Sequence, residues 1–123
     1  PLTRLGAFPR PKEPRSIWIG APDDWHASAP AQRLAALVDA INRSCAEAGV
    51  PRETRPFTPH LTLARVKGGE RQIGRAIESA GAWDHPLAIG AIAVNEFALM
   101  KSELDASGAV HTRVWGISLT PRP

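Results

Sequence analysis

Residues 56–66 read PFTPHLTLARV, a strand-forming run that follows a loop bounded by prolines. Proline cannot continue a helix or donate in a sheet ladder, so the segment before position 60 should be irregular. The alternation that follows predicts a strand running to the end of this stretch, in which side chains two positions apart share a face. His60 and Thr62 should therefore project side by side. Leu61 and Leu63 should point the other way and pack into a core.

The His60–Thr62 pair suits chemistry on a phosphate group. A threonine hydroxyl can hold a phosphate oxygen while a histidine moves a proton to or from the attacking or leaving oxygen. Arg65 lies just beyond the pair. A histidine and a threonine at this spacing also occur as an ordinary surface pair, so the spacing alone leaves a structural role open.

Outward from this stretch, the sequence predicts an α+β fold with two helices and a mainly antiparallel sheet. Ser28 should cap a helix of about five turns, because apolar residues recur at three- and four-residue steps until Gly49 ends it. Polar residues off that apolar stripe, Asn42 among them, should face water. A shorter helix is expected over residues 70–80. Strands are expected over residues 16–21, 61–66, 87–99 and 110–119, the last two joined by a turn at 105–108, and residues 9–15 should form a connector.

The composition favours one globular domain with an anionic partner. The 123 residues are 43% apolar and 22% charged, an ordinary balance for a single folded domain. No run of about 20 apolar residues is present to span a membrane, and Cys45, the one cysteine, should be buried and favours a cytoplasmic location. No histidine has a second ligand at zinc-site spacing and no glycine-rich phosphate loop occurs, so neither a metal nor a cofactor is expected. The net charge of +3, with arginine dominating the cations, favours an anionic or nucleic-acid partner.

Residues 56–66 resemble the second His-x-Thr motif of the 2H phosphoesterases, nearest to the branch called 2′-5′ RNA ligases or RNA 2′,3′-cyclic phosphodiesterases. Residues 5–11, followed by residues 17–20, are similar to the family's mid-chain strand, loop and strand, and residues 97–108 to its closing hairpin. Members of the family carry two such motifs, which face each other across a bilobed fold, whereas this sequence has one. The resemblance therefore implies that residues 1–123 form a single domain, the later part of such a fold. The first motif is expected upstream of Pro1, in agreement with the absence of a starting methionine, and residues 121–123 should form a flexible tail.

The resemblance also implies a reaction. It is the metal-independent hydrolysis of a 2′,3′-cyclic phosphate on an RNA end or nucleotide to a 2′-phosphate, with 2′-5′ joining of RNA ends in the reverse direction. His60 would act as general base and the histidine of the other motif as general acid, or the two roles would be exchanged. Thr62 would hold the non-bridging phosphate oxygens. Arg65 is the candidate phosphate contact and Phe57 the candidate platform for a base, the plain alternatives being a solvated arginine and a core aromatic.

The single motif leaves other functions open. The chain is alternatively a catalytically incomplete module that binds RNA ends or nucleotides, with Thr62, Arg65 and Phe57 as its phosphate cradle. The upstream half of the same fold, or a second copy of the chain, would be needed to complete the site. A structural or interaction role unrelated to RNA is the remaining alternative.

Overall fold

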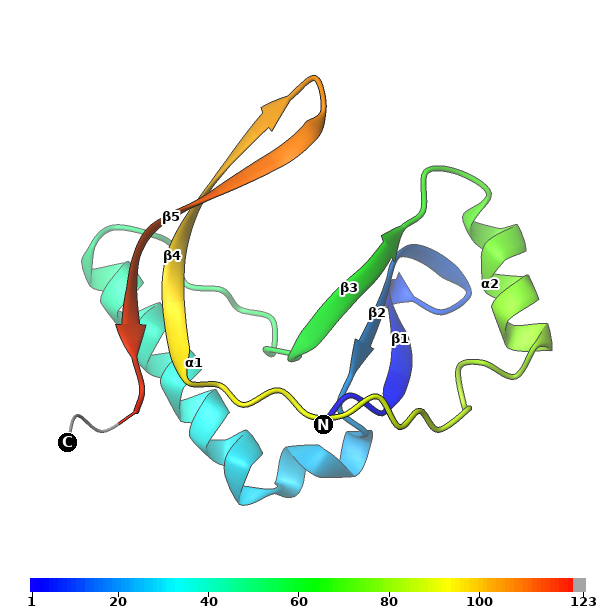
Figure 1. Ribbon diagram of the computed structural model, residues 1–123, viewed down its shortest axis with the longest axis horizontal. Helices are drawn as coiled ribbons and strands as arrows, with labels where there is room; N and C mark the ends of the chain where they lie inside the picture. The colour runs from blue at the N-terminus through cyan, green and yellow to red at the C-terminus, as the bar shows by residue number, and fades with distance from the viewer. Residues whose placement is uncertain (121–123) are drawn as a thin grey trace. The chain divides into compact units, whose positions relative to one another are not determined.

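The computed structural model of the chain describes residues 1–120 (Figure 1). These residues form two compact units, Pro1–Ala91 and a second unit that begins at Ile92. The fold class is α+β, as predicted, with two α-helices and five antiparallel strands in two small sheets within the described part of the chain. The expectation of a single domain over residues 1–123 stays a prediction, and the tail expected over residues 121–123 lies outside the described residues.

The first unit is built on a three-stranded antiparallel sheet in the order β1-β2-β3. Its strands are β1 (Arg4–Arg10), β2 (Glu13–Gly20) and β3 (His60–Arg65). The connector expected over residues 9–15 was wrong, because both β1 and β2 extend into it and leave only a two-residue turn. Pro9 pairs with Pro14 where the register of the two strands shifts. A proline is tolerated in a sheet at such an irregularity, since the donor that it lacks is not needed there.

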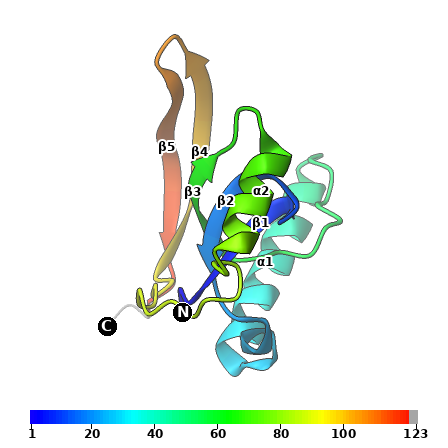
Figure 2. The same ribbon diagram turned by 90° about the vertical axis from the view of Figure 1, so that its right-hand side faces the viewer.

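The predicted helices are confirmed. The 3-10 helix η1 (Asp23–Ala27) leads into α1 (Ala29–Glu47), whose first turn is capped by Ser28: its hydroxyl accepts from the Ala31 N–H at 3.3 Å. Helix α2 (Glu70–Ser79) packs against β2, while α1 runs on the opposite side of the sheet from α2 (Figures 1 and 2). A Cβ at Gly74 would lie 2.6 Å from the carbonyl oxygens of Pro11 and Lys12, so α2 sits directly on the β1–β2 turn. No described helix is both long enough and apolar enough to cross a bilayer.

The core of the first unit centres on β2. Ile19 is 1% exposed and Trp18 is 5% exposed. The prediction that Leu61 and Leu63 pack into the core was wrong, because they are 49% and 55% exposed. The reason is topological: β3 is an edge strand, and α2 covers β2 rather than its neighbour. Cys45, expected to be buried, is only partly buried.

The second unit is a hairpin of β4 (Glu96–Asp105) and β5 (Gly108–Ser118). The predicted turn is confirmed: the Asp105 carboxylate accepts from the backbone N–H groups of Ser107 and Gly108 at 2.7 and 3.1 Å. The strand expected over residues 87–99 begins only at Glu96. The preceding residues form a single bridge, between Leu2 and Gly90, and Gly90 has a φ of +139°, which interrupts an extended strand.

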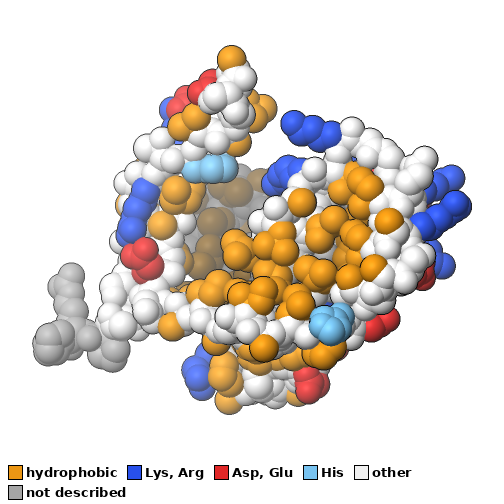
Figure 3. Space-filling view, turned by 45° about the vertical axis from the view of Figure 1, so that its right-hand side comes forward, with side chains coloured by type: hydrophobic (Ala, Val, Ile, Leu, Met, Phe, Trp, Pro, Cys, Tyr) orange, Lys and Arg blue, Asp and Glu red, His pale blue; other side chains and the backbone are white. Residues whose placement is uncertain are grey.

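Many apolar side chains remain on the surface of the described chain, as Figure 3 shows for one face. In the hairpin they include Leu99, Leu104, Val114 and Trp115, all at least 47% exposed. A two-stranded hairpin is at best marginally stable alone in water.

Candidate functional site

A β-bulge in β3 brings three polar side chains to one face of the sheet. In the β2–β3 ladder, His60 pairs with Gly20, Thr62 with Trp18, and Arg65 with Ser16. Leu63 is the extra residue at the register shift, so it opposes no residue of β2. Strict alternation would place Arg65 on the face opposite His60, whereas the bulge returns Arg65 to the face of His60 and Thr62.

These three residues line a cavity of about 710 Å³ in the first unit. All four site residues predicted from the sequence, His60, Thr62, Arg65 and Phe57, are among the residues that line it. The loop before β3 supplies Phe57, and α1 supplies Val38 and Asn42. The remaining lining residues are Phe8, Ser16, Glu53, Arg55, Pro56 and Thr58. The fold therefore gathers the predicted residues into one cavity between β3, the loop and α1.

The backbone fixes the proton on the His60 imidazole. Its Nδ1 lies 2.6 Å from the carbonyl oxygen of Thr58, two residues earlier in the loop. A carbonyl can only accept, so Nδ1 must be the donor in this hydrogen bond. In the neutral ring, Nε2 then carries the free lone pair and can take a proton. His60 is exposed and lines the cavity, so its imidazole can meet water or a ligand there.

The two arginines that line the cavity differ in their charge environment. Arg55 donates to both carboxylate oxygens of Glu53, at 3.3 and 3.2 Å. These hydrogen bonds lower the pKa of Glu53 from 4.5 to about 2, so the Glu53–Arg55 pair is internally neutralised at pH 7. Arg65 has no hydrogen bond or ion pair to another side chain among residues 1–120. Arg65 is therefore the cation of this cavity that is free to meet an anion.

Sequence reasoning missed several residues of the cavity. Asn42 was expected to face water, yet it is partly buried and lines the cavity, because α1 lies on the His60 side of the sheet. Ser16 and Phe8 belong to the cavity because their strands pair, directly or through β2, with β3. The hydrophobic pattern of α1 shows which face is apolar but not where the helix lies. No signal in the sequence could have found Asn42.

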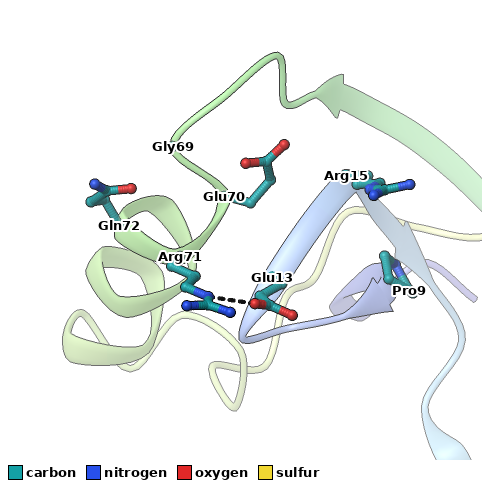
Figure 4. A pocket seen from close by; sticks show the side chains of 7 residues that line it. All are labelled: Pro9, Glu13, Arg15, Gly69, Glu70, Arg71 and Gln72. Atoms are coloured by element: carbon teal, nitrogen blue, oxygen red, sulfur yellow. Dashed lines mark hydrogen bonds and ion pairs between the residues drawn. The ribbon is translucent and has the colours of Figure 1, made fainter.

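A second cavity, of about 390 Å³, lies beside α2 and is lined by Glu13, Arg15, Glu70 and Arg71, among others (Figure 4). The Glu13 carboxylate accepts from Arg10 and from Arg71 Nε, the latter at 2.5 Å. Hydrogen bonds from Arg10 and then Arg71 lower the pKa of Glu13 from 4.5 to about 2. A carboxylate thus already occupies the place where these guanidinium groups would bind a phosphate. The arrangement ties α2 to the β1–β2 hairpin.

No cluster of three or more histidine, cysteine, aspartate or glutamate side chains that could hold a metal ion occurs in residues 1–120. The described residues that line the first cavity supply one imidazole, the hydroxyl groups of Ser16, Thr58 and Thr62, and one guanidinium without a side-chain partner. Together these groups can bind a phosphate and transfer one proton.

Residues 26–111 match the protein family described as LigT like Phosphoesterase. An RNA 2′,3′-cyclic phosphodiesterase of Aeropyrum pernix is 29% identical over 118 residues, which are 94% of this chain and 61% of that protein. The protein of the same description from Aquifex aeolicus is 32% identical over 111 residues, which are 89% of this chain and 54% of the relative. A third protein of this description, from Methanothermobacter thermautotrophicus, is 29% identical over 107 residues, which are 87% of this chain and 53% of that protein. The chain thus spans about half the length of the curated relatives it matches.

Proposed function

The chain belongs to the LigT-like phosphoesterase family, the family predicted from residues 56–66, and on that premise we propose that it carries one half of a cyclic phosphodiesterase site. The proposed substrate is an RNA end or nucleotide with a 2′,3′-cyclic phosphate, and the product is a 2′-phosphate. The observation that supports the proposal is the arrangement of β3: His60 with a free Nε2, Thr62 and the unpaired Arg65 line one cavity. The substrate class is that in the names of the relatives, RNA 2′,3′-cyclic phosphodiesterases.

In the proposed reaction, the Nε2 of His60 takes a proton from water as the water oxygen forms a bond to phosphorus. The bond between phosphorus and the 3′ oxygen breaks, and that oxygen receives a proton from a general acid. Negative charge that gathers on the non-bridging oxygens is stabilised by the Thr62 hydroxyl and the Arg65 guanidinium. With the 5′ hydroxyl of a second RNA end in place of water, His60 takes the proton of that hydroxyl as its oxygen bonds to phosphorus. The bond to the 3′ oxygen breaks as before, so the two RNA ends are joined through a 2′-5′ bond.

The general acid is the missing component. Of the described residues that line the cavity, His60 is the one histidine. We propose that the acid comes from the half of the family's length that this chain does not span. A second copy of the chain is the other source, and sedimentation that shows a strict monomer with full activity would eliminate it.

The same observation supports a second candidate function, a module that binds RNA ends without converting them. Such a module would hold a phosphate through Thr62 and Arg65 and stack a base on Phe57, whose side chain is 51% exposed. The enzyme and the binding module differ only in whether a second acid–base group reaches the phosphate.

One experiment separates the two functions. The 123-residue chain, alone and joined to the half of the family's length that it does not span, is incubated with excess 2′,3′-cyclic nucleotide, and ³¹P NMR follows formation of the 2′-phosphate. Multiple turnover by either protein supports the enzyme, while bound nucleotide without turnover in both supports the module. For the enzyme, His60→Ala should lower turnover by about 10²-fold or more, the scale for loss of an acid–base group. His85→Ala, which changes an exposed histidine outside the cavity, is the matched control. Turnover by His60→Ala at the level of the control would remove His60 from the reaction.

A further inference from the structure

Two aromatic rings, Phe8 of β1 and Trp18 of β2, lie beside the imidazole of the proposed base, His60 of β3. The Phe8 ring of β1 lies with its centroid 5.0 Å from the His60 ring, at an interplanar angle of 84°. Trp18 of β2 lies 5.8 Å from His60 and 5.2 Å from Phe8. The imidazole is therefore held by a backbone carbonyl at Nδ1 and by aromatic rings on its flank.

Two glycines create the space for this cluster. Gly6 of β1 pairs with Trp18, and a Cβ at Gly6 would overlap the indole ring. A Cβ at Gly20 would lie 2.8 Å from the Pro59 carbonyl oxygen and 3.0 Å from Cζ3 of the same indole. The indole thus packs against both glycines and is 5% exposed, so it is tightly packed. Phe8 is 37% exposed; its ring contacts the indole and also lines the cavity.

The packing matters because of how an imidazole rotates. The torsion between Cβ and Cγ is soft and roughly two-fold, so a loosely packed histidine adopts a second orientation with its ring turned over. In that orientation, Cδ2 replaces Nδ1 beside the Thr58 carbonyl, and Nε2 changes direction. A half-turn about this torsion returns the ring to the same plane. The edge-to-face contact with Phe8 therefore restrains the plane of the ring, and the hydrogen bond from Nδ1 to Thr58 selects one of the two states within that plane.

We propose that Phe8, supported by Trp18, is a positioning residue that holds the plane of the His60 imidazole where its Nδ1 meets the Thr58 carbonyl. In that orientation Nδ1 donates to Thr58 and the lone pair of Nε2 is presented to the cavity. The catalytic meaning of this inference rests on the proposed function. The claim that the imidazole has one ring orientation and one tautomer does not depend on the proposed function.

The test measures the tautomer directly. Long-range ¹H–¹⁵N NMR spectra of the ¹⁵N-histidine-labelled chain report which ring nitrogen of each histidine bears the proton. They are recorded about two pH units above the imidazole titration, where the neutral ring dominates. In the wild-type chain, His60 should show the Nδ1-protonated form in excess over His85. His85 is exposed and has no hydrogen bond to another residue among residues 1–120.

Phe8→Leu keeps an apolar side chain in β1 but removes the ring. It should shift the His60 tautomer ratio toward that of His85 by about two- to tenfold, the scale of one aromatic pair. Phe8→Tyr, which keeps the ring, should retain the wild-type ratio. Phe97→Leu is the matched control, because it removes the same ring from the Phe97–Trp115 pair of the β4–β5 hairpin. It should leave the His60 ratio unchanged.

The proposal is overturned if wild-type His60 shows no excess of the Nδ1-protonated form, or if folded Phe8→Leu keeps the wild-type ratio. Should Phe8→Leu not fold, Phe8→Met carries the same comparison, because methionine fills irregular space. Phe8→Leu should also lower kcat with little change in KM for a cyclic nucleotide. An altered tautomer with unchanged kcat would uphold the positioning role and overturn the catalytic role of His60, so the two proposals fail separately.

Discussion

Replacing Arg65 with alanine should weaken binding of a nucleoside 2′-monophosphate by about 5- to 30-fold. Arg65 lines the cavity beside His60 and Thr62 and has no ion-pair partner in the described chain, so its whole charge is available to a phosphate. Two unit charges about 4 Å apart attract by about 1 kcal/mol in water and about 4 kcal/mol near a protein surface. Because Arg65 is exposed, the lower part of this range applies, and about 1 to 2 kcal/mol corresponds to the stated loss.

Isothermal titration of the 123-residue chain with the 2′-nucleotide measures this loss. Arg65→Lys keeps the charge but not the planar fork, so an intermediate affinity would indicate a bidentate contact. The matched control is Arg75→Ala, which removes the same charge from a residue outside this cavity. It should change the affinity by less than about twofold, since Arg75 is exposed and belongs to α2, on the other side of the sheet from α1, and solvent and salt weaken its effect on a ligand in this cavity.

Two results would refute the reasoning about Arg65. An Arg65→Ala affinity within twofold of wild type would mean that the guanidinium does not reach the phosphate. An equal loss in Arg65→Ala and Arg75→Ala would mean that net charge, rather than the site created by the bulge, attracts the ligand.

Two further predictions concern stability. The folded-state pKa of Glu13 is about 2, below its ordinary 4.5, so its ion pairs stabilise the fold fully above about pH 4.5 and progressively less as the pH falls toward 2. Glu13→Gln should reduce this dependence, seen as a smaller fall in the urea midpoint from pH 6 to pH 3 than in wild type, because Glu53 keeps its own lowered pKa. A fall as large as that of wild type would contradict the assignment. Gly74→Ala should destabilise the chain by about 1 to 3 kcal/mol, because its Cβ would overlap two carbonyl oxygens, although helix propensity favours alanine by about 1 kcal/mol. The melting temperature gives the sign directly, Ser79→Ala in the same helix is the control, and a rise in Gly74→Ala would show that α2 does not sit on the turn.

The elements predicted correctly are those whose signals are local. The Ser28 cap, the apolar stripe and Gly49 all specify α1 within its own segment, and its bounds follow them closely. The hairpin turn at Asp105 is likewise determined by the residues that form it. His60 and Thr62 share a face because they are two apart on a strand, which requires no knowledge of the neighbouring strands.

What the sequence could not specify depends on pairing between distant segments. Arg65 shares the face of His60 only because β3 carries an extra residue against β2, and no residue in β3 itself specifies that bulge. The exposure of Leu61 and Leu63 depends on which strand α2 covers. Residues 87–95 have the composition of a strand but form a single bridge in the described chain, so they stay irregular. Composition specifies a tendency to pair, and only the tertiary fold supplies the strand to pair with.

The hydrogen bond at Nδ1 restricts what His60 can do in the proposed reaction. In its neutral form His60 has one lone pair, on Nε2, and so begins as a base. Once it has taken a proton, both ring nitrogens donate, and the bond to the Thr58 carbonyl becomes charge-assisted, which stabilises the imidazolium. Hydrolysis of a cyclic phosphate needs a second proton delivered to the departing oxygen while His60 still holds the first. One imidazole cannot perform both transfers at the same moment, so a complete enzyme needs a second group on the far side of the phosphate. Among the described residues that line the cavity, His60 is the one histidine, so in the proposed reaction the second group must come from elsewhere.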